Sequence, residues 1–503
     1  MNTLESAPVK NVVIAGGGTA GWIAAAALSQ QFGDLLNITL VESEDIGTVG
    51  VGEASIPPMK SFHNFLQINE QEFMRATEAT FKLGIGFENW GQVGDNYIHS
   101  FGKTGQSTWL CEFHHFWMRG LEIGATAELG AYCPELQAAK ANKFAVSSQA
   151  NLNYAYHLDA SLYAKFLRKF SETRGAKRVE GKIKSVSQHP ESGFIESITL
   201  ESGVVIAGEL FIDCTGFRGL LIEQTLKTGY EDWSHWLPCN SAVAVQTESV
   251  EPAIPYTRSI AGEAGWRWRI PLQHRVGNGL VYCDKYLSDD SATQTLLSAV
   301  DGRTINQPRI IKFTTGRRRL MWNKNCVALG LASGFVEPLE STSIHLIMMG
   351  VTRLMQLFPF AGVSPTFVEQ YNSLAVDELE KIRDFIVLHY SATEREDTPF
   401  WQYCKRMQVP DSLSHRMQMF KETGHAFQSE SELFRVDSWI QVMFGQRLMP
   451  KNYHHFAQAM KDADLTQFLA GLRKSINQTV AALPSHQEFI NYYCKSQKMM
   501  PGA

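Results

Sequence analysis

The chain has 503 residues, 44% of them hydrophobic and 19% charged, which is typical of a globular protein with a large core and room for about three average domains. Its net charge of −5 and the lack of a long basic run exclude a surface that follows a nucleic-acid backbone. We expect no membrane span, no signal peptide and, from eight scattered cysteines without a C-x-x-C pair, a cytoplasmic protein with reduced thiols.

The first predicted unit is a strand, a glycine turn, an Ala-rich helix and a second strand, over residues 11–42. Gly16, Gly18 and Gly21 fit G-x-G-x-x-G, in which the glycines permit a tight turn and the approach of a pyrophosphate to the helix N-terminus. An acid that can bind a ribose follows 21 residues later. The predicted dinucleotide contacts are Gly16, Gly18, Thr19, Ala20, Gly21 and Glu42.

A glycine-rich loop follows at residues 47–58 and ends in a proline pair, so it cannot be a regular helix. It can pass close to a ligand, although a long surface turn would have the same composition. The residues that we expect to line the cofactor are Gly50, Val51, Gly52, Glu53 and Ala54.

Residues 59–90 are predicted to be helical, and Lys82 lies there between apolar neighbours. Composition alone favours a lysine that extends to water, while a lysine held in a pocket would have a chemical role. His114 and His115 are adjacent, which is not the spacing of two metal ligands on one helix face. His157 and Asp159 match the H-x-D pattern of non-haem iron sites, but we interpret them as the start of a helix that continues to about residue 170.

Short strands are predicted over residues 178–212, and the last one runs into Asp213-Cys214-Thr215-Gly216. This places a turn with Asp213 at the carboxyl end of a sheet, where α/β folds bind ligands. A further strand at residues 265–271 carries Trp266, Trp268 and Ile270 on one face by the period of two, followed by Pro271. The two tryptophans are either core residues or the wall of a cofactor tunnel.

A second strand-to-glycine unit ends at Gly330, followed by a polar turn and an apolar helix from residue 344 to 358. Small hydroxyl residues at a helix N-terminus are suited to binding an anion, and helix capping would also explain Ser341 and Thr342. From about residue 365 onward the chain is predicted to be mainly helical.

Together these segments resemble the flavin-dependent halogenases of the two-component class, typified by tryptophan halogenases. The resemblance covers residues 10 to about 445. Its most specific mark is Trp266-x-Trp268-x-Ile270-Pro271, the W-x-W-x-I-P motif of that family. The supporting marks are the first glycine turn, Gly50-Val51-Gly52-Glu53-Ala54, Phe81-Lys82-Leu83-Gly84-Ile85 and Pro338-Leu339-Glu340-Ser341-Thr342.

The resemblance implies that a separate NAD(P)H-dependent flavin reductase supplies reduced FAD, and that O2 and a chloride or bromide ion then yield hypohalous acid. It further implies that Lys82 positions or captures the halogen, and that Glu340 assists the attack on the ring and takes up its proton. Ser341 would orient the lysine or the substrate, and Thr342 with residue 343 would bind the halide. The tryptophan strand would separate flavin from substrate.

Two features depart from the tryptophan halogenases. Ser343 stands where they usually carry glycine, which leaves the choice between chloride and bromide open. No tyrosine-rich segment for an amino-acid moiety is present, and in that region Trp439 is the candidate for ring stacking. We therefore expect an indole-like or phenol-like ring as substrate rather than free tryptophan. The alternatives are a flavin-dependent aromatic monooxygenase and a flavin-binding protein without turnover.

The implied fold is α/β: an FAD-binding Rossmann-like unit of the glutathione-reductase type, with a β-rich substrate sheet and a helical C-terminal layer. We expect an FAD-binding module at residues 1–350 with a substrate-side insertion at about 58–154, and a mainly helical substrate-side region at 351–503. A homodimer is expected only because dimers are common.

Overall fold

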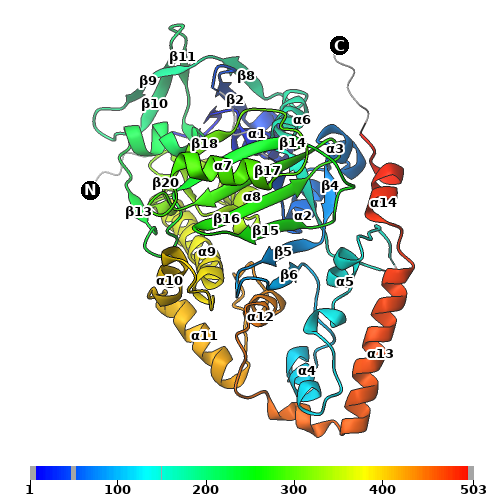
Figure 1. Ribbon diagram of the computed structural model, residues 1–503. Coiled ribbons are helices and arrows are strands. Elements are labelled where there is room, and N and C mark those ends of the chain that lie inside the picture. Colours follow the sequence, from blue (N-terminus) through cyan, green and yellow to red (C-terminus); the bar gives the residue numbers. More distant parts are fainter. Residues whose placement is uncertain (1–6, 47–51, 149, 497–503) are drawn as a thin grey trace. The chain divides into compact units, whose positions relative to one another are not determined.

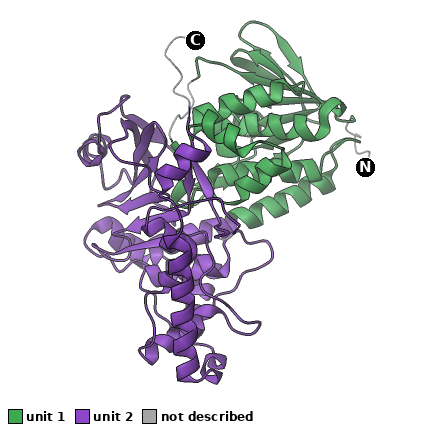
Figure 2. Ribbon diagram, turned by 90° about the vertical axis from the view of Figure 1, so that its right-hand side faces the viewer, with its two compact units in different colours: residues 1–78, 158–234, 313–379 green, residues 79–157, 235–312, 380–503 purple. Residues whose placement is uncertain are grey.

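The computed structural model describes residues 7–46, 52–148 and 150–496 (Figure 1). The chain divides into two compact units, coloured separately in Figure 2. Unit 1 comprises residues 1–78, 158–234 and 313–379, and unit 2 comprises residues 79–157, 235–312 and 380–503. Residues 235–312 therefore belong with the C-terminal helices, whereas the sequence interpretation grouped them with the FAD-binding module.

Unit 1 is built on a six-stranded sheet in the order β20-β21-β12-β1-β2-β8. Neighbouring strands from β21 to β8 are parallel, and β20 is antiparallel to β21. These strands are Asn11–Ala15 (β1), Asn37–Glu42 (β2), Lys177–Glu180 (β8), Leu210–Asp213 (β12), Trp322–Asn323 (β20) and Cys326–Ala328 (β21). The centre is apolar because parallel strands are covered on both faces.

Unit 1 also contains six α-helices or parts of α-helices among the described residues. They are Thr19–Phe32 (α1), Pro58–Phe65 (α2), Glu70–Ala76 (α3), Ala160–Glu172 (α6), Ser343–Gln356 (α8) and the first part of Pro365–Ser391 (α9). The remaining strands of unit 1 are Gly52–Ala54 (β3), Ile183–Gln188 (β9), Ile195–Leu200 (β10), Val205–Ala207 (β11), Tyr230–Asp232 (β13), Gly316–Arg318 (β19) and Gly334–Phe335 (β22). This is the expected FAD-binding Rossmann-like arrangement.

Unit 2 is built on a seven-stranded sheet in the order β18-β14-β17-β16-β15-β5-β6. Its strands are Gly84–Glu88 (β5), Asn96–Ser100 (β6), Ser241–Glu248 (β14), Thr257–Ala261 (β15), Gly265–Pro271 (β16), Arg275–Tyr282 (β17) and Arg309–Lys312 (β18). Next to it, Thr80–Lys82 (β4) pairs antiparallel with Ala155–Asp159 (β7), so that Thr80 lies opposite His157.

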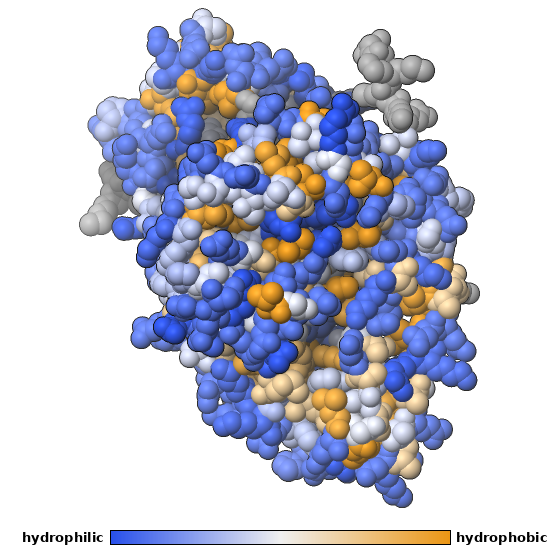
Figure 3. Space-filling view, viewed as in Figure 1, coloured by the Kyte–Doolittle hydropathy of each residue, from blue (hydrophilic) through white to orange (hydrophobic). Residues whose placement is uncertain are grey.

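The helices of unit 2 are mostly C-terminal, as the sequence predicted. They are Phe113–Glu122 (α4), Pro134–Lys140 (α5), Asp289–Ala299 (α7), Pro399–Arg406 (α10), Asp411–Thr423 (α11), Val436–Gly445 (α12), Asp462–Ala481 (α13) and His486–Tyr493 (α14). Within this unit α13 packs along α4 and α5 (Figure 1). Figure 3 shows a mainly hydrophilic face on which hydrophobic residues are scattered in small groups.

The prediction of a helix over residues 59–90 is wrong in its second half. After α2 and α3 the chain becomes extended, and Lys82 lies on a strand. Two glycines, Gly84 and Gly86, disfavour a helix here, and a Cβ atom at Gly84 would lie 2.5 Å from the carbonyl oxygen of His99. The close approach of a neighbouring strand therefore decides the structure of this stretch.

His157 also lies on a strand rather than at a helix start, although the helix that we expected begins at Ala160. Asp159 caps that helix, accepting hydrogen bonds from the N–H groups of Ser161 (2.9 Å) and Leu162 (3.0 Å). The expected helix start is confirmed, and the structure adds that the Asp159 side chain caps it.

Candidate functional site

The first glycine turn of unit 1 has the geometry of a dinucleotide-binding turn. Gly16 has a φ of 107°, and a Cβ atom there would lie 2.3 Å from the carbonyl oxygen of Cys214. A Cβ atom at Gly21 would lie 1.9 Å from the carbonyl oxygen of Gly16, whereas the space beside Gly18 is open. Helix α1 starts at Thr19 and no described side chain caps it. Its first N–H groups, from Thr19 and Ala20 onward, therefore suit a pyrophosphate.

Glu42 ends β2 directly against this turn, because a Cβ atom at Gly17 would lie 1.6 Å from its Oε2 atom. Two guanidinium groups hold the carboxylate: the Arg178 Nε atom lies 2.5 Å and the Arg168 Nη1 atom 3.9 Å from Oε1. An acid at the end of the second strand, beside the glycine turn, is where the ribose-binding carboxylate of a dinucleotide fold lies. The residues present thus fit the adenosine half of FAD.

The second predicted cofactor segment is described only in part. Gly50 and Val51 lie outside the described residues, whereas Gly52, Glu53 and Ala54 form the short strand β3. Burial raises the pKa of the Glu53 carboxyl to about 7, because a low-dielectric environment disfavours the charged form.

Asp213 and Gly330 both lie at the carboxyl ends of strands in unit 1. The buried Asp213 carboxylate accepts four hydrogen bonds, from the N–H groups of Thr215, Leu221 and Ile222 and from the Thr215 hydroxyl. These bonds use its lone pairs within the protein, so it shapes the turn. Gly330 has a φ of 63°, and a Cβ atom there would lie 2.9 Å from the Cβ atom of Ala20. Gly330 therefore lets its turn approach the start of α1.

The turn before α8 brings four predicted site residues together by chain adjacency. Glu340 and Thr342 are fully buried and Ser341 almost so, with Ser341 in the left-handed region at φ 60°. Thr342 is the N-cap residue, yet its side chain caps nothing, and its buried Oγ1 atom has no hydrogen-bond partner among the described residues. Ser343 is the first helical residue. A buried hydroxyl beside the unpaired first-turn N–H groups of a helix is chemically suited to an anion.

In unit 2 Lys82 is the last residue of β4 and is fully buried, so it does not extend to water as its composition suggested. Its Nζ atom lies 5.2 Å from the centre of the Phe101 ring. Two backbone hydrogen bonds fix the next residue, Leu83. Its N–H donates to the Pro255 carbonyl (2.7 Å), and its carbonyl accepts from the Phe101 N–H (2.9 Å). A buried lysine against an aromatic ring has the setting of a reactive group.

The tryptophan strand is confirmed as β16. Trp266 is buried and Trp268 half-buried, with ring centres 6.2 Å apart. The Trp268 Nε1 atom is buried and has no hydrogen-bond partner among the described residues. Ile270 and Pro271 are both buried at the end of the strand. These four side chains form an apolar wall, in which the Trp268 N–H group has no hydrogen-bond acceptor among the described residues.

Trp439 lies on α12, is 2% exposed, and packs edge-to-face on Phe385 at 4.8 Å between ring centres. The Arg416 guanidinium lies 4.1 Å from the centre of its ring. The Trp439 ring is thus already engaged by protein groups on two sides.

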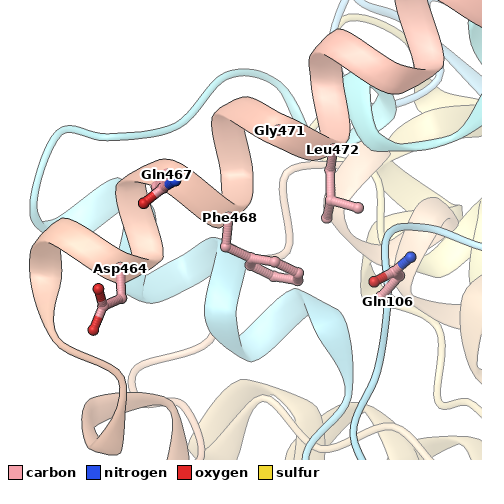
Figure 4. Close-up of a pocket in the computed structure, with 6 residues that line it drawn as sticks. All are labelled: Gln106, Asp464, Gln467, Phe468, Gly471 and Leu472. Atoms are coloured by element: carbon pink, nitrogen blue, oxygen red, sulfur yellow. The ribbon is translucent and has the colours of Figure 1, made fainter.

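Four further observations concern the described residues. A cavity of about 420 Å³ lies between α13 and Gln106, with Phe468 and Leu472 pointing toward that residue (Figure 4). It contains no predicted site residue. The described part of the chain holds no cluster of three or more His, Cys, Asp or Glu side chains suited to a metal ion. Its helices include none long and apolar enough to cross a membrane, and all eight cysteines are free.

Three neighbours of these segments were not predicted: Phe101 beside Lys82, Gly279 opposite Trp268, and His157 opposite Thr80. Only strand pairing brings them to these positions. A glycine in the middle of an apolar strand was the one sequence signal that could have pointed to Gly279.

Known proteins resemble this chain in sequence and in structure. The family model described as tryptophan halogenase matches residues 11–462. The solved structure of Xcc4156, a flavin-dependent halogenase from Xanthomonas campestris, is 54% identical with a TM-score of 0.97, over 98% of this chain and 100% of that one. BrvH, a flavin-dependent halogenase from Brevundimonas sp. BAL3, is 42% identical with a TM-score of 0.93, over 97% and 99%. The tryptophan 7-halogenase RebH of Lentzea aerocolonigenes is 35% identical over 96% of this chain and 99% of its own.

Proposed function

The chain belongs to the tryptophan halogenase family and is a flavin-dependent halogenase, and from that premise we propose that it halogenates an indole-like ring through Lys82 and Glu340. The observation that carries this proposal is the fully buried position of Lys82 on β4, with Phe101 at 5.2 Å. A flavin-dependent hydroxylase is not favoured, because the matching proteins described above are named halogenases.

FAD is the cofactor of this family, and its reduced form, when bound, supplies with O2 the oxidising power that converts a halide ion into hypohalous acid. We propose that the glycine turn and the start of α1 hold its pyrophosphate and that Glu42 binds its adenosine ribose. Gly52, Glu53 and Ala54, together with Gly50 and Val51, would line the flavin side. The open space beside Gly18 and the position of Glu42 against Gly17 support this assignment.

For the halide, we propose the N-terminal turn of α8. The N–H groups at the start of this helix and the Thr342 hydroxyl would bind chloride or bromide, and the half-buried Ser343 side chain would narrow the space for it. The buried Thr342 oxygen without a hydrogen-bond partner among described residues supports this proposal, because a buried hydroxyl is rarely left unused.

For the ring chemistry, we propose that the Lys82 ammonium donates a hydrogen bond to hypohalous acid. Alternatively, its neutral amine attacks the halogen of hypohalous acid, the oxygen–halogen bond breaks, and a haloamine and water result. Either form presents an electrophilic halogen in a site that excludes water. The buried Glu340 carboxylate would stabilise the positive charge that develops on the ring and accept the ring proton. Ser341 would orient the lysine or the substrate, and the apolar wall of Trp266, Trp268, Ile270 and Pro271 would separate substrate from flavin.

We propose an indole-like ring rather than free tryptophan as the substrate. The sequence carries no tyrosine-rich segment near residues 432–439, and the buried Trp439 ring is already covered by Phe385 and Arg416. We further propose that the enzyme is cytoplasmic, that its partner is a separate NAD(P)H-dependent flavin reductase, and that it forms homodimers.

The experiment is mass spectrometry of indole incubated with the protein, FAD, a flavin reductase, NADH and either chloride or bromide. A product with a halogen isotope pattern would support the proposal, and the two salts would show the halide preference. A product that gains one oxygen atom instead would contradict it in favour of hydroxylation.

A further inference from the structure

His157 has no part in the function proposed above, yet both of its ring nitrogens are engaged. It is fully buried on β7, directly opposite Thr80 of β4. Its Nδ1 atom lies 3.0 Å from the Thr80 hydroxyl, and its Nε2 atom lies 2.9 Å from the Thr257 hydroxyl. All three residues belong to unit 2.

The Thr80 hydroxyl gives this chain of bonds a direction. Its Oγ1 atom lies 2.7 Å from the carbonyl oxygen of Pro271. A carbonyl can only accept, so Thr80 donates its one proton to Pro271 and must accept from His157. The Nδ1 atom therefore carries the proton, and in the neutral ring Nε2 accepts from Thr257. The bonds run from Thr257 through His157 and Thr80 to Pro271.

The surroundings keep this ring neutral. Burial, followed by repulsion from the nearby Lys82 ammonium, holds the pKa of His157 well below its usual value. His486 is neutral as well, since burial lowers its pKa to about 4. Its Nε2 atom accepts the Phe81 N–H (3.2 Å) and its Nδ1 atom lies 2.7 Å from the Ala253 carbonyl.

This chain of hydrogen bonds, which we call the relay, ends at Pro271, the last residue of the tryptophan strand. Thr80 lies two residues before Lys82 on β4, and Pro271 ends β16, which carries Trp266 and Trp268. We propose that His157 is a positioning residue for halogenation: by ordering the Thr257–His157–Thr80–Pro271 bonds, it holds the strand of Lys82 at a set distance from the tryptophan strand. This inference rests on the proposed role of Lys82.

The functional experiment compares His157→Phe, which keeps the ring volume but removes both bonds, with His157→Asn, whose amide can still donate to Thr80. Thr257→Val is the matched control, since it removes only the bond to Nε2. Brominated indole and free hypobromous acid, trapped with monochlorodimedone, are measured per flavin oxidised. A lysine displaced by about 1 Å should lower product by roughly 10- to 100-fold.

The expected result is that His157→Phe loses product and releases hypobromous acid, while FAD affinity and flavin oxidation stay unchanged. His157→Asn and Thr257→Val should keep most of the brominated indole formed per flavin oxidised, because each retains a hydrogen bond between residue 157 and Thr80. A purely structural role would lower product and trapped acid together. Full coupling in His157→Phe, or equal losses in all three variants, would overturn the proposal.

A second measurement needs no variant and does not depend on Lys82. In protein with 15N-labelled histidine, the ring nitrogens of His157 should show the neutral Nδ1–H tautomer around neutral pH. The Nε2–H tautomer or a charged ring would contradict the relay. Halogenation by Lys82→Ala, in contrast, would reject the proposed function and leave this spectrum unchanged, so the two failures can be told apart.

Discussion

The indole of Trp268 lies over Gly279, its direct partner on the neighbouring strand β17. A Cβ atom at Gly279 would lie 2.1 Å from two carbons of that ring. The glycine therefore makes room for the tryptophan, and the position of the wall depends on a residue outside the family motif.

Gly279→Ala should displace the Trp268 ring. We expect it to cost about 1–3 kcal/mol of unfolding free energy, as an overpacked site does, and to lower brominated product per flavin oxidised. Urea unfolding and product analysis measure the two effects. The matched control is Gly262→Ala, where the added Cβ atom would meet nothing closer than 3.7 Å. Equal stability and coupling in both variants would show that the ring tolerates the change.

Lys82→Ala should abolish halogenation while FAD binding and O2 consumption continue, because the glycine turn that we assign to FAD belongs to unit 1. Lys82→Met, which nearly fills the same buried volume, should behave alike and so separates lost chemistry from a cavity. The measurements are product analysis, flavin titration and an oxygen electrode, with the exposed Lys103→Ala as control. Halogenation retained in both Lys82 variants would remove this residue from the mechanism.

Glu340→Gln should slow halogenation by about 10²- to 10⁴-fold, the usual loss when an acid–base group is neutralised. The amide keeps the shape of the carboxylate but can neither take up the ring proton nor offset positive charge. Single-turnover rates measure the effect. The comparison is Glu337→Gln, a buried carboxylate that begins the same turn. Matching losses would indicate a structural effect, and an unchanged Glu340→Gln rate would reject the proposed role.

Thr342→Val tests the halide site. If the buried Thr342 hydroxyl binds halide, its loss should raise the bromide KM by about tenfold, the equivalent of roughly 1.4 kcal/mol for one hydrogen bond. FAD affinity should not change. Should the hydroxyl have no ligand, the valine would instead stabilise the protein, because it removes a buried polar atom that has no described partner. Bromide titration of the rate and thermal unfolding distinguish the two results.

Glu53 makes the stability of the flavin-free protein depend on pH. Its pKa is raised to about 7 in the folded chain, so this group stabilises the fold most below its ordinary pKa, and that contribution is lost as pH rises to about 7. Glu53→Gln should therefore be more stable than the parent at about pH 8, by on the order of 1–3 kcal/mol, with the difference vanishing near pH 4.5. Urea unfolding at both pH values measures this.

The exposed Glu191→Gln is the control for Glu53→Gln. It should change stability little at either pH, because its carboxylate is already in water. A constant difference between Glu53→Gln and the parent across this pH range would contradict the raised pKa.

The residues that the sequence identified are those whose role follows from local chain geometry. Gly16, Gly18 and Gly21 had to form a turn before a helix, and Glu42 had to follow one strand later. Trp266 and Trp268 share a face because strand side chains alternate. A helix was predicted to start at Asp159 because the apolar residues that follow recur at helical spacing to about residue 170. In each case the constraint spans at most about 30 residues.

Other features depended on partners far along the chain. Lys82 was expected on a helix, and only pairing of its strand with residues 155–159 and the approach of His99 to Gly84 make it extended and buried. Asp213 was placed at the correct sheet end, yet its four donors come from the turn that it folds. By itself, the sequence determined the glycine turn before the first helix and the family, and it supplied the side chains that we propose as reactive. Tertiary structure alone decided that Lys82 is buried, that His157 forms hydrogen bonds with two hydroxyl groups and that Gly279 leaves space for the Trp268 ring. The reason is that strand register is set by long-range packing that no local pattern encodes.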